Sequence, residues 1–476
     1  MGTIQIDQVD AQAADQVPLA GPRVALLTPY SGGNLGDAAI QDSMILNLRR
    51  RLPGVQFLGI TLNSENFLKQ HGVDAFPLLA TTMPIPDPNS PRKQRTSNNL
   101  KHADIDRGSR KGLSQLARIR GALCRVPGLL RAAKKSRAFV ARCRQEMRHS
   151  LAGYRVLRSQ DLLLFSGGGQ LDEEYGGAWR LPLAYFKWAL LARMAGIPCA
   201  MISIGAGRIK IPASRFFISI ALRMCCYRSF RESKSRALCA SLLPRATKDP
   251  VIPDLAFSLP DSELPDPSEQ IRLLAGRRPI VALSPIAYAK PVNWPTPNKA
   301  IYDRYLQQMG GILTGLVQQG YFVVVVCSSL GDDETVIPDL LNIVGNEVKQ
   351  AMREQIFFPP IKTWRDLVAV LRETDYLIAS RLHGTILSFV SKTPVVAISF
   401  DPKVDWVMED LKQSEYLLHI TDFTADDALK ALKRVGADWD AAVERISLYR
   451  QSIASETARQ FEYVTGLALK HHQYQN

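Results

Sequence analysis

Short apolar runs alternate with stretches of helical periodicity through most of the chain. The runs at residues 23–28, 161–165 and 198–204 predict strands, and a second series of such runs begins at residue 280. Apolar strands separated by helices are typical of parallel sheets that helices cover on both faces. The pattern therefore predicts an α/β fold with two Rossmann-like domains whose parallel sheets face a cleft.

A stretch rich in proline and aspartate near residues 258–278 separates the two series. A final helical stretch has no strand partner, and we expect it to pack across both domains. The predicted parts are a tail (1–20), an N-terminal domain (21–265) with an insertion (85–150), a C-terminal domain (275–425) and a C-terminal helix (438–470).

Composition narrows the class of protein. Apolar residues make up 46% and charged residues 22% of 476 residues, which excludes a mostly disordered chain and a collagen-like repeat. The seven cysteines are odd in number and form no CxxC pair. This usage favours a reduced, cytoplasmic protein without a disulfide framework or zinc site. The N-terminal residues have no basic and apolar segments of a secretory signal, and every long apolar stretch is interrupted by charge.

The net charge of +14 is concentrated in one segment. Residues 92–148 hold 17 Lys and Arg but 3 Asp and Glu, and apolar residues recur at helical spacing over 113–126. Such a segment favours an anionic membrane surface, with peripheral attachment to the inner face of the plasma membrane, or an acidic partner. A partly disordered insertion with solvated charges explains it equally well. Nucleic acid is the weaker option, because Phe139 is the lone aromatic residue available for stacking.

Chemistry in parallel sheets concentrates at the carboxyl ends of the strands. The first strand is followed by a loop with Gly32, Asn34, Gly36 and Asp37, which leads into a helix. Its glycines allow close approach to a ligand, and the helix N-terminus can receive an anion. Asp37 could equally cap the helix. The loop has neither the GxGxxG nor the GKS/GKT pattern, so a P-loop is excluded.

Two further glycine-rich loops are expected in the same domain. Gly167, Gly168 and Gly169 follow the strand at 161–165, and Asp172 could hold a substrate hydroxyl or cap a turn. A third loop, 205–207, follows the next strand. Three glycine-rich strand ends together favour close approach of the backbone to a ligand over packing alone.

The C-terminal domain carries the most specific local cluster. Arg381 and His383 alternate about a leucine, so an extended segment would point both side chains the same way, just before a helix that contains Thr385. A guanidinium, an imidazole and helix amides suit a carboxylate or phosphate. Arg231, at another strand end, could clamp an anion or form a surface ion pair with Glu232.

These segments, in this order, resemble the polysaccharide pyruvyl transferase family. The basic insertion lies outside the shared pattern, and Arg231–Glu232 stands where family members often have Arg-Asp. The matching stretches are GGNLGD (32–37), SGGGQLDE (166–173), IGAG (204–207), FRESKS (230–235), DYLIASRLHGTILSFVSKTPVV (375–396) and SFDPKV (399–404).

The resemblance implies a glycosyltransferase-B-like fold and a defined reaction. The pyruvyl group of phosphoenolpyruvate would be moved onto two sugar hydroxyls, forming a cyclic pyruvate ketal and releasing phosphate, in exopolysaccharide or cell-surface polysaccharide biosynthesis. The acceptor would be a hexose or a lipid-linked oligosaccharide. Neither a metal nor an organic cofactor is implied.

The resemblance also implies roles for residues. Arg231, Arg381 and His383 would bind the anionic groups of phosphoenolpyruvate, with helix amides near Thr385 assisting. Lys403 would add positive charge or simply pair with a neighbouring aspartate. The acid would be His383, and the base or hydroxyl-orienting group Asp37 or Asp172. The remaining substrate-binding candidates are Gly32, Asn34, Gly36, Gly167, Gly168 and Gly169.

Two other functions compete with this one. A nucleotide-sugar glycosyltransferase would use the same fold, but Glu409 lacks a second glutamate eight residues later, where Leu417 stands. A non-catalytic carbohydrate-binding protein would not need three glycine-rich loops together with Arg231, Arg381 and His383.

Overall fold

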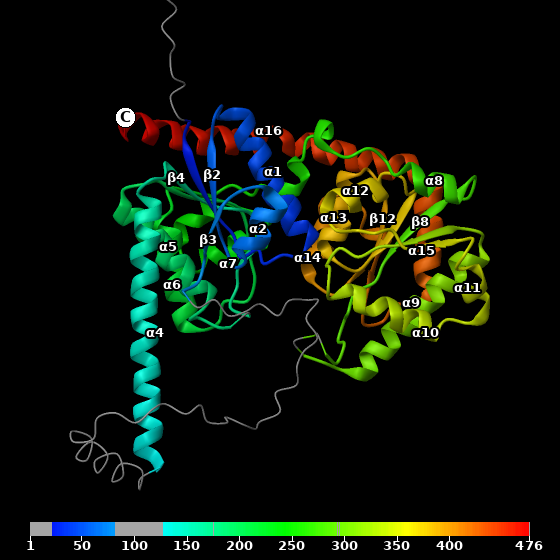
Figure 1. Cartoon of the computed structure of the whole chain (residues 1–476). Coiled ribbons are helices and arrows are strands. Elements are labelled where there is room, and N and C mark those ends of the chain that lie inside the picture. Colours follow the sequence, from blue (N-terminus) through cyan, green and yellow to red (C-terminus); the bar gives the residue numbers. More distant parts are fainter. Residues whose placement is uncertain (1–20, 81–126, 175, 293, 295, 476) are drawn as a thin grey trace, which may run out of the picture.

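The computed structural model describes residues 21–80, 127–174, 176–292, 294 and 296–475. The predicted tail (1–20) and residues 113–126, whose apolar residues recur at helical spacing, lie outside these ranges. Two parallel sheets form the centres of two domains, as the sequence predicts, and helices cover both sheets (Figure 1).

The first sheet has the strand order β3-β2-β1-β4-β6-β5, with β7 paired to β6. All its pairs are parallel. Its strands are β1 (Arg23–Leu27), β2 (Gln56–Thr61), β3 (Ala75–Pro77), β4 (Leu162–Phe165), β5 (Gly168–Leu171), β6 (Cys199–Ala206) and β7 (Tyr227–Phe230). Its helices are α1 (Leu35–Arg51), α2 (Ser64–His71), α4 (Pro127–Leu157), α5 (Leu181–Ala195), α6 (Pro212–Met224) and α7 (Ser233–Ala240).

The second sheet has the order β10-β9-β8-β11-β12-β13, and its pairs are also parallel. Its strands are β8 (Ile280–Ser284), β9 (Phe322–Val325), β10 (Ile356–Phe357), β11 (Tyr376–Ala379), β12 (Val395–Ser399) and β13 (Leu417–His419). The helices that accompany it are α8 (Glu269–Ala275), α9 (Lys299–Gln318), α10 (Val336–Ile343), α11 (Asn346–Ala351), α12 (Trp364–Leu371), α13 (Leu382–Val390), α14 (Pro402–Asp410) and α15 (Ala425–Ala437).

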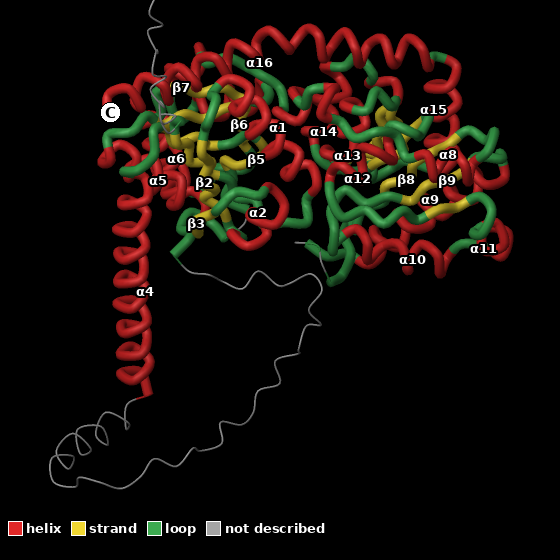
Figure 2. The backbone as a smooth tube through the Cα atoms, turned by 45° about the horizontal axis from the view of Figure 1, so that its top comes forward, coloured by secondary structure: helices red, strands yellow, loops and turns green. Residues whose placement is uncertain are grey.

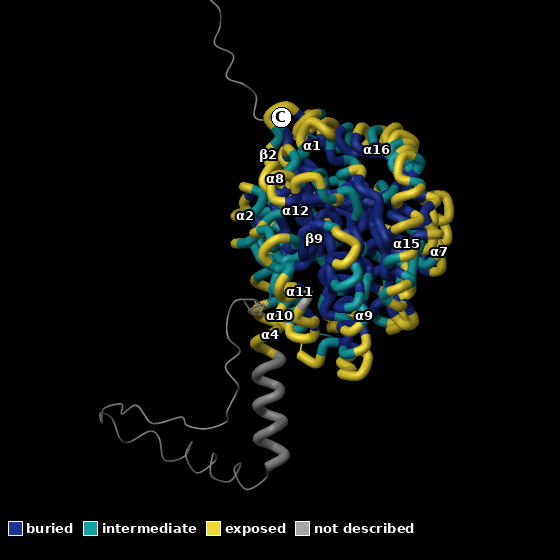
Figure 3. The backbone as a smooth tube through the Cα atoms, turned by 90° about the vertical axis from the view of Figure 1, so that its right-hand side faces the viewer, coloured by how far each residue is buried: buried dark blue, intermediate teal, exposed yellow. Residues whose placement is uncertain are grey.

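Burial follows the expectation for sheets covered on both faces. Every residue of β4, β6, β8, β9 and β12 is buried, which explains why these strands read as continuous apolar runs rather than as alternating ones. Figure 3 shows this buried interior enclosed by exposed helices.

The C-terminal helix α16 (Trp439–Gln475) packs across both domains, as predicted (Figure 2). In the N-terminal domain, Gln460 donates to the Ser203 hydroxyl and accepts from Ser229. Toward the C-terminal domain, Arg450 donates to the carbonyl of Val390. Ser203 has a left-handed φ of 48° at an irregularity in the β6–β7 register, so α16 contacts the strand where its regular pairing is interrupted.

Three local predictions were wrong. Residues 168–171 form β5 and not a loop, because they pair with β6 in parallel register. Strand β6 extends to Ala206, so most of the expected third loop is strand. The segment after β11 is extended only at Arg381, and Leu382 already begins α13. His383 therefore lies in the first turn of a helix.

The end of the predicted insertion belongs to the N-terminal domain. Helix α4 projects from this domain as a long single helix (Figure 1), and its C-terminal half returns to the sheet. There, Lys187 of α5 pairs with Glu146, and His149 contacts the carbonyl of Pro77.

Candidate active site

The loops with candidate chemistry meet at the junction of the two domains. Strand β1 lies between β2 and β4, and β8 lies between β9 and β11, so the direction of strand order reverses at each of these points. Ligands of open parallel sheets bind at such reversals. Two backbone hydrogen bonds join the loops: Leu35 donates to Ser328 (3.0 Å), and Leu330 donates to Gly33 (2.7 Å).

Asn34 connects the first helix of one domain to the imidazole of the other. As the N-cap of α1, its Oδ1 accepts from the amides of Gly36 (3.0 Å) and Asp37 (3.4 Å). The same oxygen lies 3.1 Å from His383 Nδ1. The Asn34 side chain thus caps the N-terminus of α1 and also holds the imidazole of His383, a candidate acid–base group from the C-terminal domain.

This contact determines the tautomer of His383. Because two backbone amides already donate to Asn34 Oδ1, that oxygen can be only an acceptor, so Nδ1 of His383 must carry the hydrogen. Nε2 is then the nitrogen that can gain or lose a proton. It is buried without a hydrogen-bond partner and lies 3.8 Å from Asp37 Oδ1.

Asp37 faces this nitrogen in a poorly solvated position. Its side chain is 35% exposed, yet desolvation raises the pKa of its carboxyl above the usual value. The His383 charge opposes this rise in pKa, the carboxylate of Asp254 adds to it, and Arg231 and Arg381 oppose it. A carboxyl group with a raised pKa that faces an imidazole nitrogen suits proton exchange between the two side chains.

A buried carboxylate orients Arg381. Asp333 is fully buried and accepts from Arg381 Nε (2.5 Å) and Nη2 (2.8 Å). The Arg381 side chain remains 24% exposed. Arg381 and His383 thus have different partners, and the predicted extended segment is wrong because α13 begins at Leu382; both side chains nevertheless act on the carboxyl of Asp37. Asp333 follows β9 in the sequence GDDE, so the strand-end rule that selected the other loops could have found it.

Two glycines of β5 lie beneath the charged groups. A Cβ on Gly168 would lie 3.7 Å from Asp37 Oδ1. A Cβ on Gly169 would lie 3.8 Å from Lys403 Nζ and 3.9 Å from Arg231 Nη2. The glycine-rich strand therefore lies against an acid from α1, a cation from α14 and a cation that follows β7.

Arg231 is not a surface residue. It lies buried between Glu232 (2.9 Å) and Asp254 (3.1 Å), and these carboxylates, against the opposing cost of desolvation, raise its pKa. The positive charge of Arg231 is thus neutralised by these two carboxylates. Sequence reasoning missed Asp254, which lies in a segment without a motif.

The other candidates have mainly structural contacts. Asp172 accepts from the amides of Glu174 and Arg208, which places it in a turn. The amide of Thr385 already donates to the carbonyl of Arg381, so the free amides of α13 lie earlier, at residues 382–384. Lys403 lies 3.6 Å from Asp401.

The remaining glycines permit close packing. Gly32 has a φ of +96° and lies against Asn66, and Gly167 packs on Leu255. A Cβ on Gly36 would lie 2.0 Å from His383 Cγ. Gly36 is therefore required for the imidazole to approach α1.

Aromatic rings were also missed at the carboxyl edge of the second sheet. Tyr288 and Trp294 follow β8, and Phe400 follows β12 directly before Asp401, the N-cap of α14. Their ring centroids lie 5.2–5.8 Å apart, and each ring is partly exposed.

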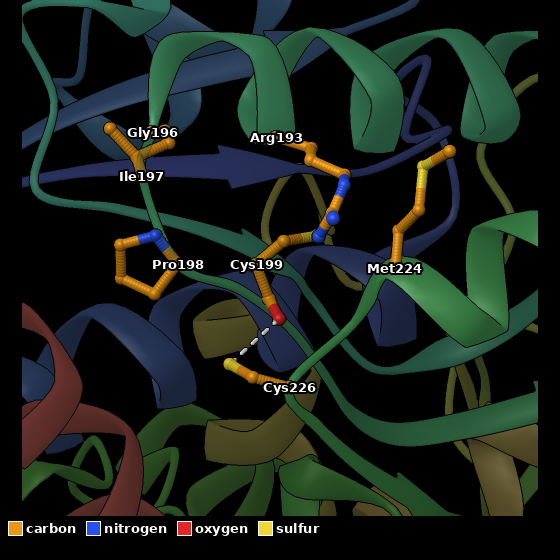
Figure 4. Close-up of a pocket in the computed structure, with 7 residues that line it drawn as sticks. All are labelled: Arg193, Gly196, Ile197, Pro198, Cys199, Met224 and Cys226. Atoms are coloured by element: carbon orange, nitrogen blue, oxygen red, sulfur yellow. Dashed lines mark hydrogen bonds between the residues drawn. The ribbon is translucent and has the colours of Figure 1, made fainter.

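Other features of the described residues lie away from this junction. A cavity of about 530 Å³ lies at the opposite, amino edge of β6 (Figure 4). There Cys226 Sγ donates to the carbonyl of Cys199, and Cys199 is buried as predicted. The described residues contain no cluster of three or more metal-ligating side chains, and none of their helices is long and apolar enough to cross a membrane.

Comparison with solved structures gives the fold. A UDP-glucose: anthocyanidin 3-O-glucosyltransferase in complex with UDP is 11% identical, with a TM-score of 0.52 over 94% of this chain and 99% of that one. A protein from Anabaena in complex with UDP is 12% identical, with a TM-score of 0.50 over 94% and 99%. The glycosyltransferase of kitacinnamycin is 13% identical, with a TM-score of 0.50 over 94% and 100%. The predicted glycosyltransferase-B-like fold is confirmed.

Comparison of sequences gives the family. None of the curated proteins compared with the chain matches it. The family model for polysaccharide pyruvyl transferase matches residues 34–402, from Asn34 in the first loop to Pro402 at the start of α14. This range includes the glycine pair of β5, Arg231 and the Arg381–His383 segment. The chain therefore belongs to the polysaccharide pyruvyl transferase family, a family of enzymes.

Proposed function

We propose that the enzyme transfers the pyruvyl group of phosphoenolpyruvate to two hydroxyls of a sugar, with His383 and Asp37 as the proton-exchanging pair. The observation that carries the proposal is the free Nε2 of His383, held 3.8 Å from Asp37, whose carboxyl also feels the charges of Arg231 and Arg381. The family match supports a sugar polymer or its precursor as acceptor.

The donor needs binding groups for a carboxylate and a phosphate. Arg381, held by Asp333 but still 24% exposed, offers guanidinium hydrogens. Lys403 contributes a point charge from α14, and the amides at residues 382–384 contribute the N-terminus of α13. Arg231 is already balanced by two carboxylates, so we assign it to orienting the site and not to holding the phosphate.

The reaction needs a balanced set of proton transfers. The methylene carbon of phosphoenolpyruvate gains a proton and becomes the methyl group, while a sugar hydroxyl bonds to the adjacent carbon and loses its proton. The bond from that carbon to the phosphate oxygen breaks, phosphate leaves with one proton, and a second hydroxyl bonds to the same carbon as it loses its own. Two protons are thus released and two are taken up.

His383 Nε2 and Asp37 can mediate these transfers. The imidazolium would donate toward the donor substrate, and the Asp37 carboxylate would accept from the hydroxyl. Nδ1 stays bonded to Asn34, so the ring keeps its orientation while Nε2 changes its protonation state. No residue outside the junction is needed for the exchange.

The acceptor would lie on the aromatic side of the junction. The partly exposed side chains of Tyr288, Trp294 and Phe400 offer apolar faces beside the N-terminus of α14. Such faces suit the apolar side of a hexose ring. A hexose or lipid-linked oligosaccharide in exopolysaccharide assembly, used in the cytoplasm, is the acceptor class we propose.

Binding of an anionic membrane by residues 92–148 remains a separate prediction. Deleting this segment should then weaken the binding of the protein to vesicles.

Thermal unfolding with ligands tests the donor assignment. Phosphoenolpyruvate at about a hundred times its dissociation constant should stabilise the protein by roughly 2.7 kcal/mol. The shift should disappear in Arg381→Ala and Lys403→Ala and persist in Lys430→Ala, a matched control because Lys430 is exposed on α15. A shift with UDP-sugars but none with phosphoenolpyruvate, in the presence of acceptor sugars, would favour glycosyl transfer and refute the proposal.

A further inference from the structure

An exposed apolar patch lies at one end of the N-terminal domain. Trp179 is 73% exposed, Phe216 57% and Ile211 41%. Their neighbour Phe217 is buried and contacts Trp179 and Phe216 with ring centroids 5.5 and 5.7 Å away. Two of the exposed side chains, Trp179 and Phe216, thus pack on the buried ring of Phe217 and are not isolated on the surface.

Contacts between two loops hold the patch together. Trp179 belongs to the loop between β5 and α5, and Ile211 ends the loop between β6 and α6. The amides of Lys210 and Ile211 donate to Glu173 of the first loop. A Cβ on Gly177 would lie 3.9 Å from the Ile211 side chain. The apolar side chains are therefore presented from fixed backbone.

The patch lies on the same edge of the sheet as the candidate active site. Both loops leave the carboxyl ends of their strands, and the first one follows the glycine pair 168–169 directly. Asp172, in the same loop, closes its turn. A surface bound to this patch would therefore lie beside the junction where the chemistry takes place.

The neighbouring helices are strongly basic. Helices α5 and α6 and residues 140–157 of α4 hold eight Lys and Arg against one Glu. Two of these cations, Arg193 and Arg223, lie in the last turns of α5 and α6, toward the amino edge of the sheet and away from the patch. The one acid, Glu146, is paired with Lys187. The two loops add Arg180, Arg208 and Lys210 but also three acids, of which Asp172 and Glu173 are held by backbone amides. Met147 and Leu151 are exposed on α4 among these cations.

We propose that the patch formed by Trp179, Ile211 and Phe216 docks the enzyme on an anionic phospholipid bilayer. Trp is favoured at the boundary between headgroups and acyl chains, and cations around it are attracted to acidic headgroups. A second copy of this chain fits less well, because two such basic layers would repel each other. Docking here would hold the active-site edge near acceptors carried by lipid. The inference does not depend on phosphoenolpyruvate as donor, and of residues 92–148 it uses only the part of α4 from residue 140 onward.

Vesicle flotation tests the proposal with the full chain. The protein should float with vesicles of phosphatidylcholine mixed with phosphatidylglycerol, and far less with phosphatidylcholine alone or in high salt. Trp179→Ser combined with Phe216→Ser should lower the partition coefficient about tenfold or more, and Lys210→Glu combined with Arg215→Glu should do the same. Leu273→Ser on α8 is the matched control, because Leu273 is 81% exposed in the other domain.

Two independent measurements check that the variants are folded and that Trp179 contacts the bilayer. Unchanged Tm values would show that the variants are folded, and the blue shift of Trp fluorescence on vesicle addition should be smaller in Trp179→Phe. Absence of binding to mixed vesicles, or equal binding by wild type and both double variants, would overturn the proposal. So would a wild-type dimer in sedimentation that the Trp179→Ser, Phe216→Ser variant converts to monomer, because the patch would then be an interface between copies.

Discussion

Replacing Gly36 by alanine should remove catalysis while leaving the fold in place. The added methyl group would lie 2.0 Å from His383 Cγ, 2.1 Å from its Cβ and 2.6 Å from its Cδ2. The imidazole has to retreat by about 1.4 Å to reach the 3.4 Å of ordinary contact, and because its Cβ is crowded as closely, the first turn of α13 has to move with it. Such a movement breaks the 3.1 Å contact of Nδ1 with Asn34 and turns Nε2 away from Asp37.

The cost to stability should be small. Crowding in a packed site costs about 1–3 kcal/mol, whereas alanine in a helix gains about 1 kcal/mol over glycine, so the net loss is about 0–2 kcal/mol. The cost to the reaction should be larger, because a misplacement of about 1 Å in a catalytic group can lower the rate about a hundredfold.

Phosphate release from phosphoenolpyruvate, with an acceptor present, measures the rate, and thermal unfolding measures the stability. Gly466→Ala is the control, because no atom lies within 4 Å of a Cβ at that position of α16. It should leave turnover unchanged and stabilise the protein slightly. Wild-type turnover in a folded Gly36→Ala variant would refute the role of His383 argued above.

Three further outcomes follow from the same geometry. Asp333→Asn should destabilise the protein by up to about 3–5 kcal/mol and raise the KM for phosphoenolpyruvate, because Arg381 loses its buried charged partner; an unchanged KM would contradict the orienting role. Asp37→Asn should lower kcat sharply. It should not lower Tm at neutral pH, because the raised pKa of the Asp37 carboxyl means that its ionisation destabilises the folded state. The fall in rate at acid pH that wild-type Asp37 causes, centred above 3.8, should be absent in this variant. Trp364→Phe should cost about 1–3 kcal/mol in denaturant unfolding, since it removes the 2.7 Å bond that Trp364 Nε1 donates to Asp42 across the domains; no loss would show that this bond does not support the domain arrangement.

The pattern of the chain determined the class of fold. The continuous apolar runs of β4 and β12 could only be buried on both sides, and that requirement predicts parallel sheets with helices on both faces. It also determined which loops are candidates for the chemistry, since the carboxyl ends of parallel strands lie on one edge. For that reason Asp37, His383 and Lys403 could be selected before their positions were known.

Only the tertiary structure decided how these residues are paired. The partner of Arg381 is Asp333, and the partners of Arg231 are Glu232 and Asp254, all set by the packing of separate strand ends. Local pattern likewise could not show that the glycines at 168–169 extend a strand, because glycine has no side chain to mark a strand face. Their pairing with β6 decides it.

The same limit applies to the tautomer of His383. A sequence can place an imidazole near a helix start, but the hydrogen on Nδ1 depends on an oxygen of Asn34, 349 residues away in the chain. Periodicity and strand-end position are local properties, and so the sequence determined the elements and the candidate groups. Which side chains pair is set when segments that are distant in the sequence pack together and exclude water. For that reason only the tertiary structure determined the partners of these candidate groups.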